Sequence, residues 1–242
     1  MREWWRELRQ ELTGLALPSS CAGCGLPRTR GRLCGQCDSV LEAAVPRRVW
    51  PSPVPYGLPP VYGAMAYADE VRAMILAHKE RGALRLAGPL GEVLAAVVRA
   101  AAASQGAGAG ASSSGEGPLT LVPVPSARRA VAVRGHDPVR RMALAAAREL
   151  RRCGLSASVL PVLRQRRLVA DQAGLTAGAR LANLSGALEI VPGGGTLLDR
   201  GETVLVDDLM TTGASLVEAA RAVRGQARRG TVAAVVAVRS KG

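Results

Sequence analysis

The 242-residue chain lacks phenylalanine altogether and has few aromatic residues of any kind. Its three tryptophans and three tyrosines make up 2% of the sequence, and all six precede residue 68. Proteins that bind single-stranded nucleic acid stack the bases on aromatic side chains, and the rest of this chain offers none. The composition therefore disfavours a dedicated single-strand binder and leaves binding through charge alone open.

Long apolar runs are also missing from the sequence. None reaches the roughly 18 residues that a membrane span needs, and the most apolar stretch, residues 93–103, is interrupted by Arg99. The N-terminal segment alternates acidic and basic residues, and its apolar stretch stops at Pro18, which does not fit a secretion signal. We therefore expect a cytoplasmic protein with no membrane span.

Lysine and asparagine are nearly absent. Of the 32 basic residues only Lys79 and Lys241 are lysines. The formal net charge of +13 suggests nucleic acid, membrane headgroups or a phosphorylated ligand as a partner. The abundance of Arg, Ala, Gly and Val is also typical of GC-rich coding sequence, so arginine richness is a weak guide to function. Residues that stay rare are correspondingly informative, namely Lys79, His78, His136 and the only asparagine, Asn183.

The length suits one α/β domain with a small accessory module. Apolar residues at helical spacing predict an amphipathic helix over residues 2–17, docked on its own protein or, as the alternative, on a membrane surface. This helix and a cysteine-rich stretch form a predicted module over residues 1–45. The proline-rich residues 46–60 predict a connector, and residues 61–242 a single domain with a flexible Gly/Ala/Ser loop at 104–117.

Strands and helices are predicted to alternate from Val61 onward. Apolar runs predict strands at residues 61–68, 119–124, 159–163, 187–191, 203–206 and 232–238. Helical patterns cover residues 69–79, 84–103, 138–153 and 215–224, and Asp137 followed by Pro138 is typical of a helix start. Continuous apolar strands separated by helices indicate a parallel sheet that is covered on both faces.

Four of the five cysteines follow a metal-binding pattern, Cys21-x2-Cys24-x9-Cys34-x2-Cys37. Each CxxC pair can turn two thiolates toward one ion, and two pairs complete a tetrahedral site. Two disulfides, a redox CxxC and an iron–sulfur site are the alternatives, and the lack of a secretion signal disfavours disulfides. We predict a structural Zn²⁺ site, closed to catalysis, in a zinc-ribbon or knuckle module.

The most specific motif is the segment VLVDDLMTTGASL, residues 204–216. A buried strand leads into the carboxylates of Asp207 and Asp208, and a short loop with hydroxyl groups and a glycine precedes a helix. Backbone N–H groups at such a helix start bind phosphate, and the predicted cradle consists of Thr211, Thr212, Gly213, Ala214 and Ser215. Two carboxylates would repel a bare phosphate but can bind ribose hydroxyls, so the motif predicts a sugar-phosphate site.

This motif resembles the ribose-phosphate signature of type I phosphoribosyltransferases. Val122–Ser126 with the box Arg134–Asp137, and Asp171–Leu175 with Arg180 and Asn183, are similar to two further stretches of that superfamily. Together with the N-terminal cysteine module, they make the chain resemble the ComF family, competence protein F and its relatives, over residues 12–239. The family box commonly reads RGFNQ and here reads RGHDP, so no role carries over to His136 or Asp137.

The resemblance implies a type I phosphoribosyltransferase-like parallel sheet flanked by helices, with phosphoribosyl pyrophosphate and Mg²⁺ as ligands. It implies that residues 211–215 hold the 5′-phosphate and that Asp207 and Asp208 bind the ribose hydroxyls, directly or through the metal. The pyrophosphate would meet residues at the other side of the site, namely Pro125, Ser126, Arg134 and Gln172. The run 164–167 with Gln172 falls where type I enzymes carry a mobile covering loop.

The acceptor is not readable from the sequence. The hypoxanthine-type branch carries an acidic residue where Thr211 stands, which leaves Glu80 and Asp171 as candidate bases. The first hypothesis is therefore an enzyme that transfers the phosphoribosyl group to a nitrogen acceptor. The second is a non-catalytic sensor of phosphoribosyl pyrophosphate or a nucleotide that acts with DNA or a DNA-processing protein, for instance in DNA uptake. A third, a zinc-ribbon nucleic-acid binder that has lost its ligand, is disfavoured by the Asp207–Asp208 pair.

Overall fold

The structure is a computed structural model that describes residues 20–27, 32–106, 118–167, 176–199, 201–227 and 230–239. The predicted helix over 2–17, most of the predicted loop 104–117 and the segment 171–175 with Gln172 lie outside the described residues.

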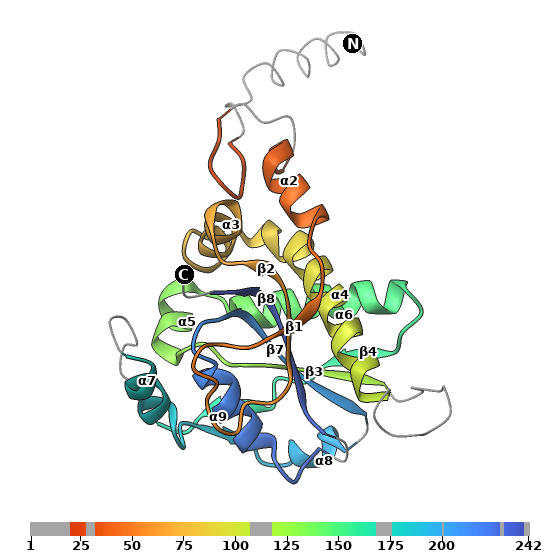
Figure 1. The fold of residues 1–242 in the computed structure, drawn as a ribbon, viewed down its shortest axis with the longest axis vertical. Helices are drawn as coiled ribbons and strands as arrows, with labels where there is room; N and C mark the ends of the chain where they lie inside the picture. Colours follow the sequence, from red (N-terminus) through yellow and green to blue (C-terminus); the bar gives the residue numbers. More distant parts are fainter. Residues whose placement is uncertain are drawn as a thin grey trace, which may run out of the picture.

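A six-stranded sheet forms the centre of the molecule (Figure 1), with the strand order β1-β2-β8-β7-β3-β4. Its strands are β1 (Arg47–Val49), β2 (Val61–Ala66), β3 (Leu119–Pro123), β4 (Ala157–Val159), β7 (Glu202–Met210) and β8 (Val232–Val238). All neighbours pair in parallel except β1, which is antiparallel to β2. A separate antiparallel pair joins β5 (Leu163–Gln165) and β6 (Leu188–Ile190).

Helices cover both faces of the sheet, as the apolar strands predict. One core contains Val204 and Val206 of β7, and the residue between them, Leu205, belongs to the other. The first core is built with α3 (Asp69–Glu80), α4 (Ala87–Gly106) and α6 (Pro138–Arg152), and the second with α9 (Ala214–Val223). The remaining short helices are α2 (Gly35–Glu42), η1 (Leu84–Leu86), α5 (Arg128–Arg134), α7 (Ala177–Leu184) and α8 (Gly195–Leu198).

The predicted α/β class and the mostly parallel sheet with flanking helices are confirmed. The strand predicted at 159–163 is wrong, because β4 ends at Val159 and β5 begins at Leu163, with Pro161 between them. Proline has no backbone N–H to donate to a strand neighbour, which explains the break. The connector predicted at 46–60 contains the edge strand β1, where prolines before and after Arg47–Val49 are tolerated.

The helical stretch Leu84–Gln105, most of which is α4, is long and apolar enough to cross a membrane by length and composition alone. Half of its most apolar part is buried inside the protein. It packs against α6 and β8 inside the first core, where Leu90, Leu94, Val97 and Val98 are buried. These contacts account for its apolar character, since a helix in a protein core is apolar for the same reason as a helix in lipid.

The crossing of α4 and α6 depends on Gly91. A Cβ atom added to Gly91 would lie 2.5 Å from Ala145 Cβ and 3.0 Å from the Ala146 backbone nitrogen. We therefore expect Gly91→Ala to lower the free energy of unfolding by about 1–3 kcal/mol, measured by urea denaturation. Gly88→Ala is the matched control, because its nearest neighbour would be Arg32 Nη1 at 3.7 Å. The control should gain up to about 1 kcal/mol from helix propensity, and equal stability of the two variants would contradict the packing argument.

Candidate functional site

The sheet topology places a switch point between β3 and β7. The chain passes from β3 outward to β4 and then returns to the opposite side of β3 to form β7. In open α/β sheets, ligands bind at the carboxyl ends of the strands where the connections diverge in this way. The segments after β3 and at the end of β7 are the two that the sequence predicts as a ligand site.

Strand β7 extends beyond β3 at this edge. The last paired residue of β3 is Pro123, opposite Val206, after which the Val124 N–H donates to the Val206 carbonyl at 2.9 Å. Residues 207–210 continue beside β8 alone, and Met210 pairs with Val238. The strand predicted to stop at Val206 therefore runs through both acidic residues, and β3 does not pair with them.

The two carboxylates differ in their surroundings. Asp208 is 3% exposed, and its Oδ2 atom lies 2.8 Å from Lys79 Nζ on the last turn of α3. Asp207 is partly exposed, and its Oδ1 atom accepts a hydrogen bond from the Asp208 N–H at 2.9 Å. The Asp208 carboxylate is thus paired with a cation of the protein, while the Asp207 carboxylate contacts the backbone and is partly exposed.

Burial and the neighbouring carboxylate of Asp208 raise the pKa of Asp207 well above its usual range. Burial alone would lower the pKa of Lys79, but the charges of Asp208 and Asp207 outweigh it and raise that pKa. Lys79 is therefore charged at neutral pH. A ligand hydroxyl or a cation at Asp207 would relieve the repulsion between the two carboxylates.

The loop after β7 presents the predicted phosphate-binding residues. Gly213 has φ +76° and caps α9, and no side chain caps the helix there. Its conformation favours glycine, and the first N–H groups of α9 are free of helical acceptors by geometry. The predicted cradle residues lie together, with Gly213 and Ala214 buried and Thr211, Thr212 and Ser215 partly exposed. The arrangement suits an anion at the helix start.

The proline-rich segment packs on this loop, which the sequence does not predict. A Cβ atom on Gly213 would lie 2.9 Å from Leu58 Cδ1 and 3.5 Å from Pro51 Cγ and Pro55 Cγ. On the same segment, Trp50 and Tyr56 are 64% and 95% exposed. Residues 51–58 thus cover one side of the loop and limit how a ligand can approach it.

The residues predicted on the pyrophosphate side are brought to the same edge only in part. Pro125 and Ser126 follow β3 and are partly exposed, whereas Gln172 lies outside the described residues. Arg134 forms a two-pronged ion pair with Glu80, with Nε–Oε2 at 2.9 Å and Nη2–Oε1 at 2.6 Å. Arg134, which is predicted to bind the pyrophosphate, and Glu80, a predicted candidate base, therefore neutralise each other in this structure. To bind a pyrophosphate, Arg134 would have to leave Glu80 or contact both groups at once.

His78 and His136 connect the end of α3 to the start of α6 near the site. His78 is 1% exposed, with Nε2 at 3.2 Å from the Pro138 carbonyl, and His136 Nε2 lies 3.2 Å from the His78 carbonyl. These contacts join the end of α3 to the start of α6. The rare histidines thus contribute to the structure that holds Lys79.

Burial lowers the pKa of His78 below its ordinary value of about 6.5. The unfolded chain then binds more protons than the folded one as the pH falls through about 6.5, so the free energy of unfolding decreases on acidification. We expect the melting temperature to drop between about pH 6.5 and pH 5, and the drop to be shallower in His78→Gln. Identical acid profiles for wild type and variant would contradict this role.

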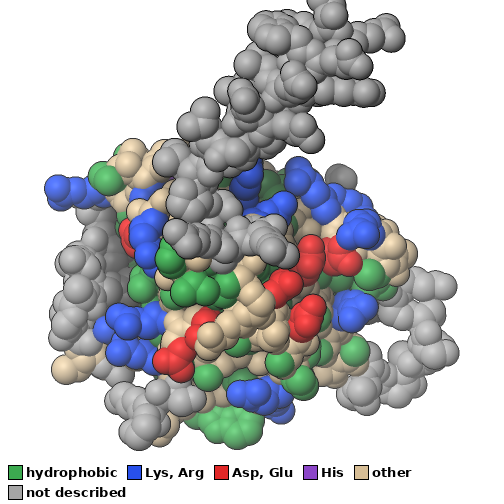
Figure 2. Space-filling model, turned by 90° about the horizontal axis from the view of Figure 1, so that it is seen from above, with side chains coloured by type: hydrophobic (Ala, Val, Ile, Leu, Met, Phe, Trp, Pro, Cys, Tyr) green, Lys and Arg blue, Asp and Glu red, His purple; other side chains and the backbone are tan. Residues whose placement is uncertain are grey.

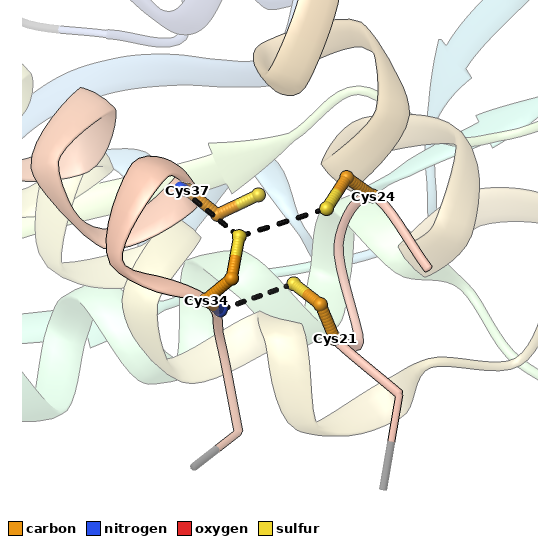
Figure 3. A group of neighbouring side chains, drawn as sticks. All are labelled: Cys21, Cys24, Cys34 and Cys37. Carbon is orange, nitrogen blue, oxygen red and sulfur yellow. Dashed lines mark hydrogen bonds between the residues drawn. The ribbon is translucent and has the colours of Figure 1, made fainter. Parts of the chain in front are cut away.

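The four predicted cysteine ligands come together (Figure 3). Cys21 and Cys24 lie on one loop, Cys34 caps α2, Cys37 lies in its first turn, and all four Sγ atoms are within 4.8 Å of one another. Four thiolates bound to one zinc ion at about 2.3 Å lie roughly 3.8 Å apart, so the cluster fits a tetrahedral ion. The Cys34 N–H donates to Cys21 Sγ at 3.2 Å, which is the kind of hydrogen bond that orients a metal thiolate. The fifth cysteine, Cys153, is exposed.

The cysteine module packs on α3, the helix that carries Lys79. A Cβ atom on Gly23 would lie 2.6 Å from Met74 Cγ, and Gln36 Nε2 donates to Glu70 Oε1 at 2.6 Å. Cys21, Cys34 and Cys37 belong to the same apolar core as Met74 and Ile75. The possible metal site therefore supports one face of the helix whose end reaches the acidic pair.

Basic and acidic side chains of the described residues are interspersed over the face seen in Figure 2. Two hollows among the described residues, about 390 and 250 Å³, lie along α9 and are lined by Arg224 and Gly57 among others, not by Asp207 or Asp208. The acidic pair instead adjoins hydroxyl groups and the start of α9, a combination that suits a polar ligand.

No family model matches this chain, and no curated protein matches its sequence. The case for a function therefore depends on the residues of this edge. The sequence marks Lys79 as a rare residue type but does not link it to Asp208. Its only sign of a role in the sequence is that it is a lysine in a chain whose other basic residues are almost all arginines.

Proposed function

We propose that this protein binds phosphoribosyl pyrophosphate and transfers its phosphoribosyl group to a nitrogen acceptor, as a ComF-type member of the type I phosphoribosyltransferases. The observation that carries the proposal is the position of the acidic pair and the loop 211–215 at the switch point of a parallel sheet. This combination suits a sugar phosphate, since the helix start binds the phosphate and the carboxylates bind the hydroxyls.

In this proposal each part of the ligand has its own contacts. The 5′-phosphate lies on the N–H groups of Gly213, Ala214 and Ser215, and Thr211 and Thr212 add hydroxyl donors. Asp207 accepts hydrogen bonds from the ribose hydroxyls. The pyrophosphate extends toward Ser126, where Arg134 can neutralise it.

Mg²⁺ fits this site in part. Carboxylates and phosphate oxygens are its preferred ligands, and Asp207 is partly exposed, whereas Asp208 Oδ2 is held by Lys79. Asp207 and the pyrophosphate would therefore hold the ion, and its charge would stabilise the departing pyrophosphate. The protein contributes orientation and fixed charge as the bond from the anomeric carbon to the pyrophosphate oxygen breaks and the bond to the acceptor nitrogen forms.

Two observations favour a second function. Thr211 stands where some relatives in the superfamily have an acidic base, and the ion pair between Glu80 and Arg134 engages both a candidate base and a candidate pyrophosphate ligand. In this alternative the site senses phosphoribosyl pyrophosphate or a nucleotide without catalysis, and the protein acts with DNA or a DNA-processing partner.

One titration separates the two functions. The protein is titrated calorimetrically with phosphoribosyl pyrophosphate in the presence of Mg²⁺, and pyrophosphate release is then assayed with a panel of nucleobases and amines. Binding with acceptor-dependent release supports the transferase, and binding without release for any acceptor supports the sensor. Absence of binding would exclude both.

A further inference from the structure

The acidic pair has its own cation, supplied from a different element. Lys79 is in the last turn of α3, and its ammonium reaches Asp208 across 129 residues of sequence at 2.8 Å. The side chain of Asp208 is 5% exposed and that of Lys79 is 30% exposed, so the pair is largely shielded from water. An ion pair in such a place is stronger than one on the surface, where salt and solvent screen it.

The position of Lys79 is held from three sides. His78 and His136 fix the chain on either side of the turn, Glu80 binds Arg134 at 2.6 Å, and Met74 packs on the cysteine module. The turn therefore presents its ammonium in one place, where a long and otherwise flexible side chain would lose much rotamer freedom. Such preorganisation is typical of a group that acts on a ligand.

The need for a cation at this edge follows from charge. The proposed ligand carries several negative charges, and two carboxylates at its ribose would repel it unless a positive charge is nearby. Charge complementarity of this kind raises the association rate and the specificity of binding. The usual source of that charge is a divalent ion, whereas this chain holds a fixed one beside Asp208.

From this geometry we infer that Lys79 is a positioning residue that serves as a built-in counter-cation of the ligand site. It holds the Asp208 carboxylate and replaces part of the charge that Mg²⁺ would otherwise supply. This inference rests on the proposed binding of phosphoribosyl pyrophosphate. Its consequence is that the ligand binds with a reduced requirement for divalent cation.

The test compares Lys79→Gln, Lys79→Arg and wild type by calorimetric titration with phosphoribosyl pyrophosphate over a series of Mg²⁺ concentrations, starting in EDTA. Wild type should bind measurably in EDTA. Lys79→Gln should bind roughly tenfold more weakly at low Mg²⁺, and the gap should close as Mg²⁺ rises, because the ion restores the lost charge. Lys79→Arg keeps the charge and should stay closer to wild type.

Arg72→Gln is the matched control, since Arg72 is exposed on the same helix and its replacement removes the same charge. It should bind as wild type does. An equal weakening of Lys79→Gln at every Mg²⁺ concentration, or no weakening, would overturn the inference. If Lys79→Gln fails to fold, the wild-type titrations decide alone. Wild type that binds in Mg²⁺ but not in EDTA would overturn the inference, and wild type that binds under both conditions would support it. Wild type that binds under neither condition would instead refute the proposed function.

Discussion

Cys37→Ser is expected to abolish metal binding by the cysteine module and to unfold that module. Cys37 is 0% exposed and shares a core with Leu41 and Met74, so both a metal ligand and a packing contact depend on it. Zinc contributes about 10–16 kcal/mol to the folding of small four-ligand modules, so loss of the ion should unfold this module. The zinc content of the purified protein, measured by metal analysis, should fall from one ion per chain to near zero.

The consequence should extend to the main domain, because the module packs on α3. We expect the melting temperature of wild type to fall on chelation, and that of Cys37→Ser to be low and insensitive to chelator. Cys153→Ser is the control, since Cys153 is exposed and lies outside the cluster. A Cys37→Ser protein that keeps a full equivalent of zinc would show that the four thiolates are not the site.

The double variant Asp207→Asn, Asp208→Asn is expected to lose binding of phosphoribosyl pyrophosphate by at least about 100-fold. A hydrogen bond to a charged group contributes roughly 1.5–3 kcal/mol, and two such bonds to ribose correspond to a factor of about 10² to 10⁴. Calorimetric titration at saturating Mg²⁺ measures the loss. Unfolding temperature should be recorded for the same samples, so that binding is compared between folded proteins.

The direction of this change is diagnostic. If the carboxylates had no contact with the ligand, removing two negative charges would reduce repulsion and strengthen binding of an anionic ligand. Glu92→Gln is the matched control, because Glu92 is exposed on α4 and its loss removes a charge away from this edge. Tighter binding by the double variant would therefore refute the sugar-phosphate assignment.

Several features of the fold followed from local sequence patterns. The strand Val232–Val238 matches its prediction, since a run of seven apolar residues can only be buried on both faces. The start of α6 was equally predictable, because the Asp137 carboxylate accepts from the Arg140 N–H and Pro138 occupies the first turn. Both signals are contained within a few consecutive residues.

The extent of β7 and the role of residues 46–60 were not predictable in the same way. Asp207 and Asp208 have low strand propensity, and they lie in a strand because β8 pairs with them. The prolines at 51 and 55 cover Gly213, which the sheet makes possible by placing β2 next to β8 and β8 next to β7. Tertiary pairing overrides propensity here, and no window of sequence contains both partners.

The sequence by itself determined the chemistry of this protein: the four thiolates at metal-ligand spacing, the paired carboxylates, and the hydroxyl- and glycine-containing loop at a helix start. These are properties of neighbouring residues, and local spacing is enough to show them. Only the tertiary structure decided which carboxylate is paired, because Lys79 and Asp208 are 129 residues apart and meet only when the end of α3 comes near the end of β7. It also decided that Glu80 binds Arg134 and that the cysteine module supports α3, since long-range contacts depend on the arrangement of the whole chain.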